Sequence, residues 1–282
     1  RAVAVVRRHT GAKAGHAGTL DPLATGVLPV ALGEATKTIG YAIGGWKRYR
    51  FRIRWGIARS GEDGEGEIVG ETGARPSIAA IEAALPCFIG TIWQVPPAHS
   101  AIRIAGRRAY TLARAGRTPA LAARPVEISA LRLVAAPDAD HADFEATVGK
   151  GTYIRALARD LAAALGTLGH VAALRRLAVG RFTEAQAISL ETVASWRHID
   201  EACGYLLPIE SALDDIPAVV LAASEAARLR LGQCVMPCDP KVRAGLDQLG
   251  RGSVVGAWRE DALVAFARIE AGGLQAVRVL NR

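Results

Sequence analysis

The stretch WKRYRFRIRW, residues 46–55, decides the fold prediction because two kinds of residue alternate strictly along it. One set is Arg48, Arg50, Arg52 and Arg54, and the other is Tyr49, Phe51, Ile53 and Trp55. A period of two is that of a β-strand, whose successive side chains point to opposite faces of a sheet. The stretch therefore predicts a strand with one buried apolar face and one basic face.

The basic face of this strand has two interpretations. The arginines are either the solvent side of a core strand or ligands for phosphate groups, and these two kinds of arginine look alike in sequence. On the other face, Tyr49 is either a core residue or the edge of a pocket. The alternation itself leaves both questions open.

The neighbouring segments predict an α+β fold with a mixed sheet. Residues 77–85 read as a helix that stops before Pro86. Residues 126–134 and 142–148 read as two strands, and 149–166 as a helix with Thr152 as its N-cap. Residues 58–67 read as a loop rich in glycine and acidic residues.

The composition changes after about residue 213. A short strand and one helix are expected in 213–232, followed by strands at 253–260, 263–270 and 274–280. The Gly272-Gly273 pair predicts a hairpin between the last two strands. We expect a first domain at 1–213 and a small β-barrel-like domain at 216–282.

The charge distribution indicates a polyanionic partner. Residues 1–60 contain eleven Lys or Arg against Asp21 and Glu34, whereas the remaining 222 residues have a net charge of −1. A basic region of this kind favours nucleic acid, although a solvated basic surface is the plain alternative.

The sequence disfavours four other classes: secreted, membrane-spanning, disulfide-rich and zinc-binding proteins. The opening RAVAVVRR reads as the interior of a helix, so we expect native N-terminal sequence to be missing, and it does not read as a secretory signal. Apolar runs fall short of a membrane span. Four cysteines are too few for a disulfide scaffold, and Cys234 and Cys238 lack a second pair at zinc spacing. We expect a cytoplasmic monomer with no metal and no membrane contact.

The stretch GHAGTLDPLATGVL, residues 15–28, places one carboxylate in an apolar setting. Asp21 precedes Pro22, which favours extended backbone at Asp21 and a tight loop rather than a helix. Its counter-charge must come from elsewhere in the chain. Motifs of P-loop, dinucleotide-binding, serine-hydrolase and zinc-protease sites are missing. Asp21 is either an ordinary turn residue or a nucleophile or base, and Glu34, in an expected helix, reads as a solvated residue.

A longer segment that begins with this stretch, GHAGTLDPLATGVLPVALGEATK at 15–37, resembles the signature of the TruB family of tRNA pseudouridine synthases. Two further blocks, at 94–116 and 149–182, are similar to the family's second and third blocks, and the tail from about 216 is similar to a PUA-type RNA-binding domain. The resemblance implies a pseudouridine synthase fold, with a mixed, mainly antiparallel sheet flanked by helices. It also implies isomerisation of a uridine in the tRNA T loop (position 55) to pseudouridine, with base flipping and without a cofactor.

The resemblance also assigns roles to single residues. Asp21 matches the catalytic aspartate, which attacks either C1′ of the ribose or C6 of the uracil. Arg155 matches the arginine that pairs with it. The positions matching the base pocket and the space left by the flipped nucleotide are His16, Tyr49, Tyr153 and Leu174. Candidates for contacts with the RNA backbone are Arg103, Arg107, Arg108 and Lys150.

The chain departs from the family pattern in four places. The N-terminal Lys-Pro-x-Gly block is missing, Arg103 replaces a lysine, Gly149 replaces a serine, and residues 58–67 differ from the usual Thr-Asp-Thr segment. Two further hypotheses remain: an RNA-binding module with a vestigial site, and a hydrolase of the sugar–base bond. A missing second carboxylate disfavours the hydrolase.

Overall fold

The computed structural model describes residues 1–42, 45–100, 102–104, 107–109, 111, 121–213 and 216–281. The chain forms two compact units. The sheet unit comprises Thr19–Leu28 and Gly45–Ala187, and the terminal unit comprises Arg1–Gly18, Pro29–Gly44 and Ile188–Arg282.

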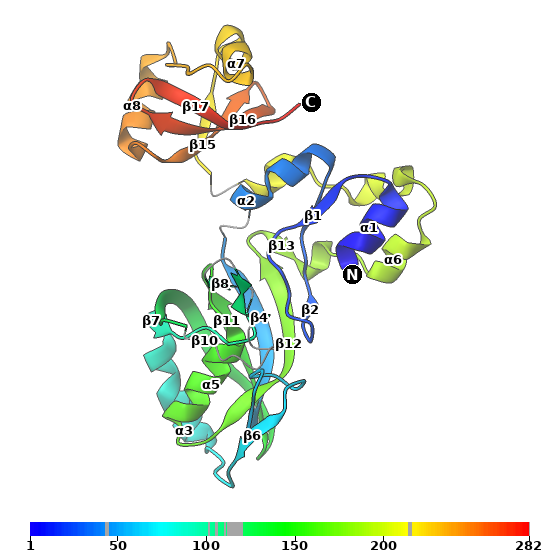
Figure 1. Ribbon diagram of the computed structural model, residues 1–282, viewed down its shortest axis with the longest axis vertical. Helices are drawn as coiled ribbons and strands as arrows, with labels where there is room; N and C mark the ends of the chain where they lie inside the picture. Colours follow the sequence, from blue (N-terminus) through cyan, green and yellow to red (C-terminus); the bar gives the residue numbers. More distant parts are fainter. Residues whose placement is uncertain are drawn as a thin grey trace. The chain divides into compact units, whose positions relative to one another are not determined.

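A seven-stranded sheet forms the centre of the sheet unit. Six of its strands are antiparallel in the order β13-β12-β4-β11-β10-β7, and β2 pairs with β12 in parallel. The predicted mixed, mainly antiparallel sheet is therefore confirmed (Figure 1). These strands are β2 (Thr25–Gly26), β4 (Lys47–Trp55), β7 (Gly90–Gln94), β10 (Arg124–Asp138), β11 (His141–Val148), β12 (Gly169–Val179) and β13 (Phe182–Thr183). The unit also contains β5 (Ile57–Arg59), β6 (Ile68–Glu71), β8 (Arg103–Ile104), β9 (Arg107–Arg108), α3 (Ile78–Ala84), α5 (Ile154–Ala164), and the 3-10 helices η2 (Leu85–Phe88) and η3 (Glu184–Gln186).

Strand β4 is the alternating stretch, and it lies in the middle of the sheet. Phe51, Ile53 and Trp55 are buried on the face that α3 and α5 cover (Figure 1). The Phe51 ring stacks on Phe144 of β11 at a centroid distance of 5.4 Å. The apolar face predicted from the alternation is thus the main core of this unit, and burial of such side chains is the chief stabilising term.

Part of the basic face of β4 is paired with acidic residues on or next to its neighbour β11. Arg52 lies opposite Asp143 in the register and donates to both of its carboxylate oxygens, at 2.7 and 2.8 Å. These hydrogen bonds from Arg52 lower the pKa of Asp143. Arg54 donates to Asp140 at 2.8 Å. Arg52 and Arg54 therefore form ion pairs with carboxylates of the protein itself. Arg48 is exposed.

The helix of residues 149–166 begins later than its sequence predicts. Thr152 was expected to be the N-cap, but Tyr153 occupies that position in extended backbone and α5 begins at Ile154. The Thr152 hydroxyl instead donates to the carbonyl of Glu127 at 3.4 Å. The end is as expected, since Gly166 follows the helix with a φ of 69°.

The terminal unit combines the N-terminal helix with the C-terminal sheet. Its sheet has the order β14-β15-β16-β17, with β14 parallel to β15 and the other pairs antiparallel. The hairpin expected near Gly272-Gly273 is confirmed, because Glu270 pairs with Gly273. The elements are α1 (Ala2–Thr10), β1 (Ala14–His16), β3 (Val30–Leu32), η1 (Gly33–Lys37), α2 (Ile39–Ala42), α6 (Leu190–Ser195), η4 (Ile199–Tyr205), η5 (Ile209–Ala212), β14 (Ala218–Val220), α7 (Ala223–Arg230), α8 (Pro240–Leu249), β15 (Val254–Arg259), β16 (Ala262–Glu270) and β17 (Gly273–Val279).

Helix α8 was not predicted from the sequence, although its ends carry ordinary signals. Asp239 caps it, Pro240 begins it and Gly250 ends it.

In the part of the chain that the structure describes, no helix is both long and apolar enough to cross a membrane.

The buried His170 gives a pH-dependent test of the sheet unit. This residue is 4% exposed and its Nδ1 lies 2.9 Å from the carbonyl oxygen of Ile57. Burial lowers the pKa of His170, so the unfolded chain binds its proton at a higher pH than the folded protein does. We expect the free energy of unfolding to fall as the pH drops below about 6.5, by at most about 1.4 kcal/mol per pH unit from this group.

Urea unfolding at pH 7.5, 6.0 and 5.0 measures this effect. Because carboxylates also become protonated in this range, the readout is the difference between the wild type and His170→Gln. That difference should shrink as the pH falls. A difference that is constant with pH would contradict the assigned burial effect.

Candidate active site

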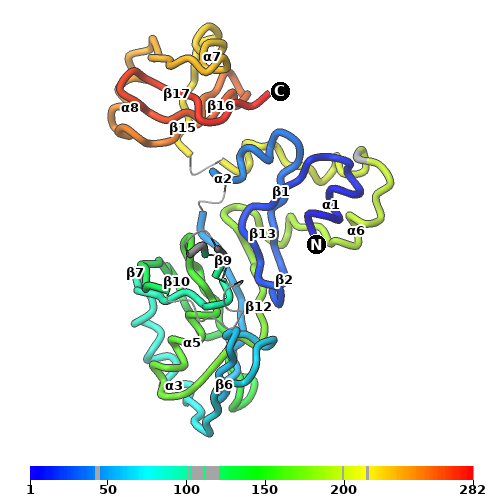
Figure 2. The backbone as a smooth tube through the Cα atoms, viewed as in Figure 1, coloured from blue at the N-terminus to red at the C-terminus, as the bar shows by residue number. Residues whose placement is uncertain are grey.

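A tight turn presents Asp21. The carbonyl of Asp21 accepts a hydrogen bond from the amide of Ala24 at 2.9 Å, and Pro22 occupies the position where its fixed φ suits a turn. Strand β2 then holds the loop against β12, where the amide of Val27 donates to the carbonyl of Arg176 at 2.8 Å (Figure 2). The rigid loop expected for Asp21 is therefore present.

The counter-charge of Asp21 is Arg155, in the first turn of α5. Its Nε donates to Asp21 Oδ2 at 2.8 Å and its Nη2 donates to Oδ1 at 3.1 Å. Both carboxylate oxygens are thus fixed by one planar group, which is the geometry that makes arginine–carboxylate pairs strong. The Asp21 side chain keeps 28% of its accessible surface, whereas the Arg155 side chain keeps 4%.

The remaining donors of Arg155 face the loops around the site. Nη1 donates to the carbonyl of Gly61 at 2.8 Å, and Nη2 donates to the carbonyl of His99 at 3.0 Å. Nη1 also lies 3.5 Å from Oδ2 of Asp63. A lysine has one charged nitrogen and cannot reproduce this planar arrangement. Arg155 therefore joins three segments that are far apart in the chain.

Tyr153 is fixed by Gln94, the last residue of β7. The Tyr153 amide donates to Gln94 Oε1 at 2.8 Å, and Gln94 Nε2 donates to the Tyr153 carbonyl at 3.2 Å. Gln94 is 1% exposed, so its side chain is committed to this pair of bonds. The guanidinium of Arg124 lies 5.3 Å from the centroid of the Tyr153 ring, at cation–π distance.

Tyr49 lies on β4, close enough to Asp21 for the carboxylate to affect the pKa of the tyrosine hydroxyl. Burial raises the pKa of Tyr49, and the Asp21 carboxylate raises it further, while a hydrogen bond with Arg176 acts in the opposite direction. Tyr49 therefore remains protonated at neutral pH. Arg176 is 1% exposed, and its Nε donates to the carbonyl of Val27 at 2.8 Å. Arg176 thus contacts both the Asp21 loop and Tyr49.

The other predicted residues divide into four groups. Leu174 is buried in the main core, where it pairs with Phe51 across β4 and β12. Lys150 is exposed. His16 lies on β1 in the terminal unit, and its Nδ1 is buried with no hydrogen-bond partner among the described residues. Arg103, Arg107 and Arg108 lie on the β8–β9 pair, but their side chains are outside the part of the structure that is described.

Three residues of the site were missed by the reading of the sequence. Asp63 lies in the loop expected at 58–67, but nothing in the sequence relates that loop to Arg155. Gln94 stands at the start of a block used for the resemblance, and Arg176 stands inside another. Their roles depend on partners 59 and 149 residues away in the chain, as in the bonds of Gln94 to Tyr153 and of Arg176 to Val27.

Two family models together match most of the chain. A model of the TruB family pseudouridylate synthase N-terminal domain matches residues 7–154, and one of the tRNA pseudouridylate synthase B C-terminal domain matches residues 155–214. The chain belongs to the TruB family. The predicted resemblance is therefore confirmed, and the family's pseudouridylate synthases are isomerases.

Relatives of this chain in the TruB family carry the name tRNA pseudouridine synthase B. The protein from Caulobacter sp. (strain K31) is 50% identical over 282 residues, which cover 99% of this chain and 91% of that protein. The protein from Rhodospirillum rubrum is 48% identical, with coverages of 98% and 89%.

The fold is also similar to that of solved structures that contain Cbf5. The structure of the archaeal box H/ACA sRNP Nop10-Cbf5 complex matches with a TM-score of 0.73 at 21% identity, over 99% of this chain and 81% of that chain. A Cbf5-Nop10-Gar1 complex matches with a TM-score of 0.72 at 23% identity, covering 99% and 80%. At these identities the likeness supports the fold alone. Within the described ranges, no group of three or more His, Cys, Asp or Glu side chains could hold a metal ion.

Gly26 offers a direct test of the loop that presents Asp21. Its φ is +95°, and a Cβ there would lie 2.2 Å from the carbonyl oxygen of Arg176. We expect Gly26→Ala to lower both the melting temperature and the rate of pseudouridine formation, because backbone strain is added to a collision with backbone atoms. Gly90→Ala is the matched control, since Gly90 has a φ of +97° and nothing within 4 Å of the added carbon. Equal losses in the two variants would contradict the tight packing assigned to the loop.

Proposed function

We propose that the protein isomerises the uridine at position 55 in the T loop of tRNA to pseudouridine, with Asp21 as its catalytic side chain. The observation that carries the proposal is the Asp21 carboxylate, which is partly exposed on a rigid turn and held through both oxygens by the buried Arg155. The names of the relatives, tRNA pseudouridine synthase B, support tRNA as the substrate.

The reaction needs only groups that the chain itself supplies. The N-glycosidic bond breaks, the uracil turns while it is bound, and its C5 joins C1′; C5 loses a proton and N1 gains one, so the atoms balance without a redox step. An ionised carboxylate oxygen is nucleophilic. Asp21 attacks either C1′ of the ribose or C6 of the uracil, and its pairing with Arg155 is compatible with both.

The target nucleotide must leave the base stack before it can reach Asp21. Flipping a base out of folded RNA costs a few kcal/mol. In the proposal, stacking on Tyr49 recovers part of this, since base–aromatic stacking contributes about 1–3 kcal/mol. Tyr153 and Leu174 complete the pocket walls, and His16 fills the space that the nucleotide leaves.

The proposal also covers the parts of the chain that bind the rest of the RNA. Residues 1–213 form the catalytic domain, and residues 216–282 form a PUA-like RNA-binding domain. The RNA backbone lies against the basic residues named for that role, which are Arg103, Arg107, Arg108 and Lys150.

Substitution of the nucleophile tests the proposal. We expect Asp21→Asn to reduce the release of tritium from tRNA labelled at C5 of uridine by at least about a thousandfold, because the amide is not a nucleophile. Its affinity for the T stem-loop should stay within about threefold of the wild type. Equal turnover by the two proteins would reject Asp21 as the nucleophile, and release of free uracil would indicate a hydrolase.

Substitution of its partner separates catalysis from binding. We expect Arg155→Lys to lower the single-turnover rate by at least about a hundredfold, because a point charge cannot hold both oxygens of Asp21. The dissociation constant for tRNA should change much less, since Arg155 is buried behind the carboxylate. Melting temperatures identify any general loss of structure. Losses of similar size in rate and affinity would contradict this role.

A further inference from the structure

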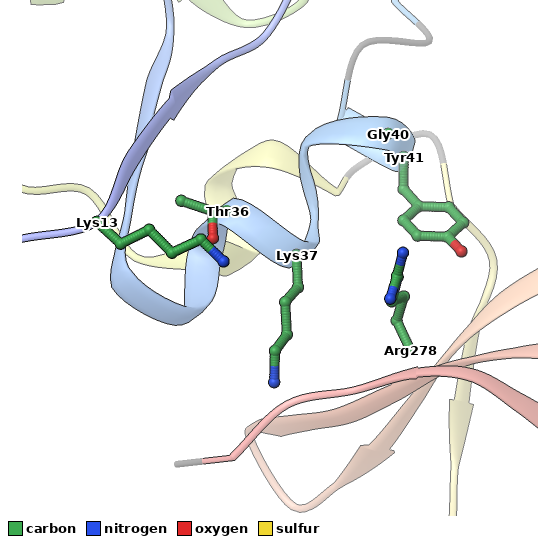
Figure 3. A pocket seen from close by; sticks show the side chains of 6 residues that line it. All are labelled: Lys13, Thr36, Lys37, Gly40, Tyr41 and Arg278. Atoms are coloured by element: carbon green, nitrogen blue, oxygen red, sulfur yellow. The ribbon is translucent and has the colours of Figure 1, made fainter. Parts of the chain in front are cut away.

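A basic pocket lies in the terminal unit and involves none of the residues assigned to the active site. It has a volume of about 560 Å³ and is lined by Lys13, Thr36, Lys37, Gly40, Tyr41 and Arg278. Figure 3 shows Lys37 and Arg278 extending into the space between the η1–α2 segment and the C-terminal sheet. Tyr41 and Lys13 lie at the sides of this space. A volume of this size suits a small ligand or one unit of a larger one.

The lining is strongly cationic and has no carboxylate. Lys37 is fixed by two acceptors, because its Nζ donates to Glu34 Oε2 at 2.8 Å and to the carbonyl of Val279 at 3.1 Å. Glu34 in turn accepts from the amide of Asn281 at 2.8 Å, so this carboxylate is already engaged. Three cations therefore face a single nearby carboxylate, and Lys13 and Arg278 are both exposed.

The pocket is held in shape by a contact between distant parts of the chain. The Tyr41 ring stacks on Phe266 of β16 at 4.1 Å with an interplanar angle of 14°. Phe266 is fully buried in a cluster with Leu213, Leu263 and Leu280. The contact joins α2 to the strand that lies beside Arg278 in the register. The cations are thus brought together by packing and not only by flexible side chains.

We propose that this pocket binds a phosphate of the tRNA backbone outside the T stem-loop. The proposal rests on the proposed function, which supplies RNA as the polyanion that the three lining cations attract, one of them being paired with Glu34. Lysine and arginine together suit a phosphodiester, since arginine forms paired hydrogen bonds and lysine acts as a point charge. The pocket thereby extends recognition from the target loop to the body of the tRNA.

The test compares full-length tRNA transcript with the isolated T stem-loop. In the double variant Lys13→Ala/Arg278→Ala, we expect affinity for full-length tRNA to fall about tenfold, and the slope of log Kd against log salt to decrease by about one to two. Affinity for the T stem-loop and its conversion to pseudouridine should equal those of the wild type. The charge-retaining variant Lys13→Arg/Arg278→Lys should restore most of the affinity for full-length tRNA.

The matched control is Lys241→Ala/Arg251→Ala, which removes the same charge from exposed positions outside the pocket. Unchanged affinity for full-length tRNA in the pocket variant would overturn the proposal, as would an equal loss in the control. An equal loss with the T stem-loop would also overturn it. If inorganic phosphate raises the melting temperature of the wild type but tRNA affinity is unaffected, the pocket takes a free anion instead. Conversion of the T stem-loop by the wild type reports separately on the proposed function.

Discussion

The buried guanidinium of Arg155 is the group on which the active site depends. It binds both oxygens of Asp21 and the carbonyls of two other loops, and it lies beside a second carboxylate, Asp63. A buried cation is costly unless its donors are satisfied, and removal of its partners leaves that cost uncompensated. The Asp21 turn, the loop containing Gly61 and Asp63, and the segment containing His99 therefore depend on one another through Arg155.

The sheet places this guanidinium by ordinary core packing. Helix α5 packs its apolar side on β4 and β12, and Arg155 is in its first turn. The same strands carry Tyr49 and Arg176, and β12 also pairs with the loop that follows Asp21. The stacking tyrosine proposed for the reaction is thus part of the sheet, and the proposed nucleophile lies in the loop that β2 attaches to the same sheet. This arrangement lets a partly exposed carboxylate keep a fixed position without being fully buried.

Much of the fold could be predicted from local patterns, because alternation and turn chemistry act over a few residues. The β4 strand, the Asp21 turn and the hairpin at Gly272-Gly273 are of this kind. Thr152 shows the limit, since a carbonyl of β10 competes for the hydroxyl that was expected to cap α5. Helix α8 was missed even though its capping residues are in the sequence.

The site was predictable only in part. The turn at Asp21 followed from its neighbours, but the partner lies 134 residues away, and only the family resemblance identified it. Asp63 and Arg176 act through contacts that spacing does not reveal. Likewise, the Tyr41 ring stacks on Phe266, and both residues belong to the compact unit that contains Ile188–Arg282 and the N-terminal segments. No local pattern in either segment indicates that contact.

We infer that Arg155 fixes Asp21 for the reaction, and that Asp63, whose Oδ2 lies 3.5 Å from Arg155 Nη1, acts on the reaction only through Arg155. A double-mutant cycle with Asp63→Asn and Arg155→Met, read as single-turnover rates of pseudouridine formation, tests it most directly. The account predicts that Asp63→Asn slows the wild type by about tenfold or more but slows Arg155→Met by less than about threefold. Losses that simply multiply in the double variant would show that the two residues act independently and would contradict the account.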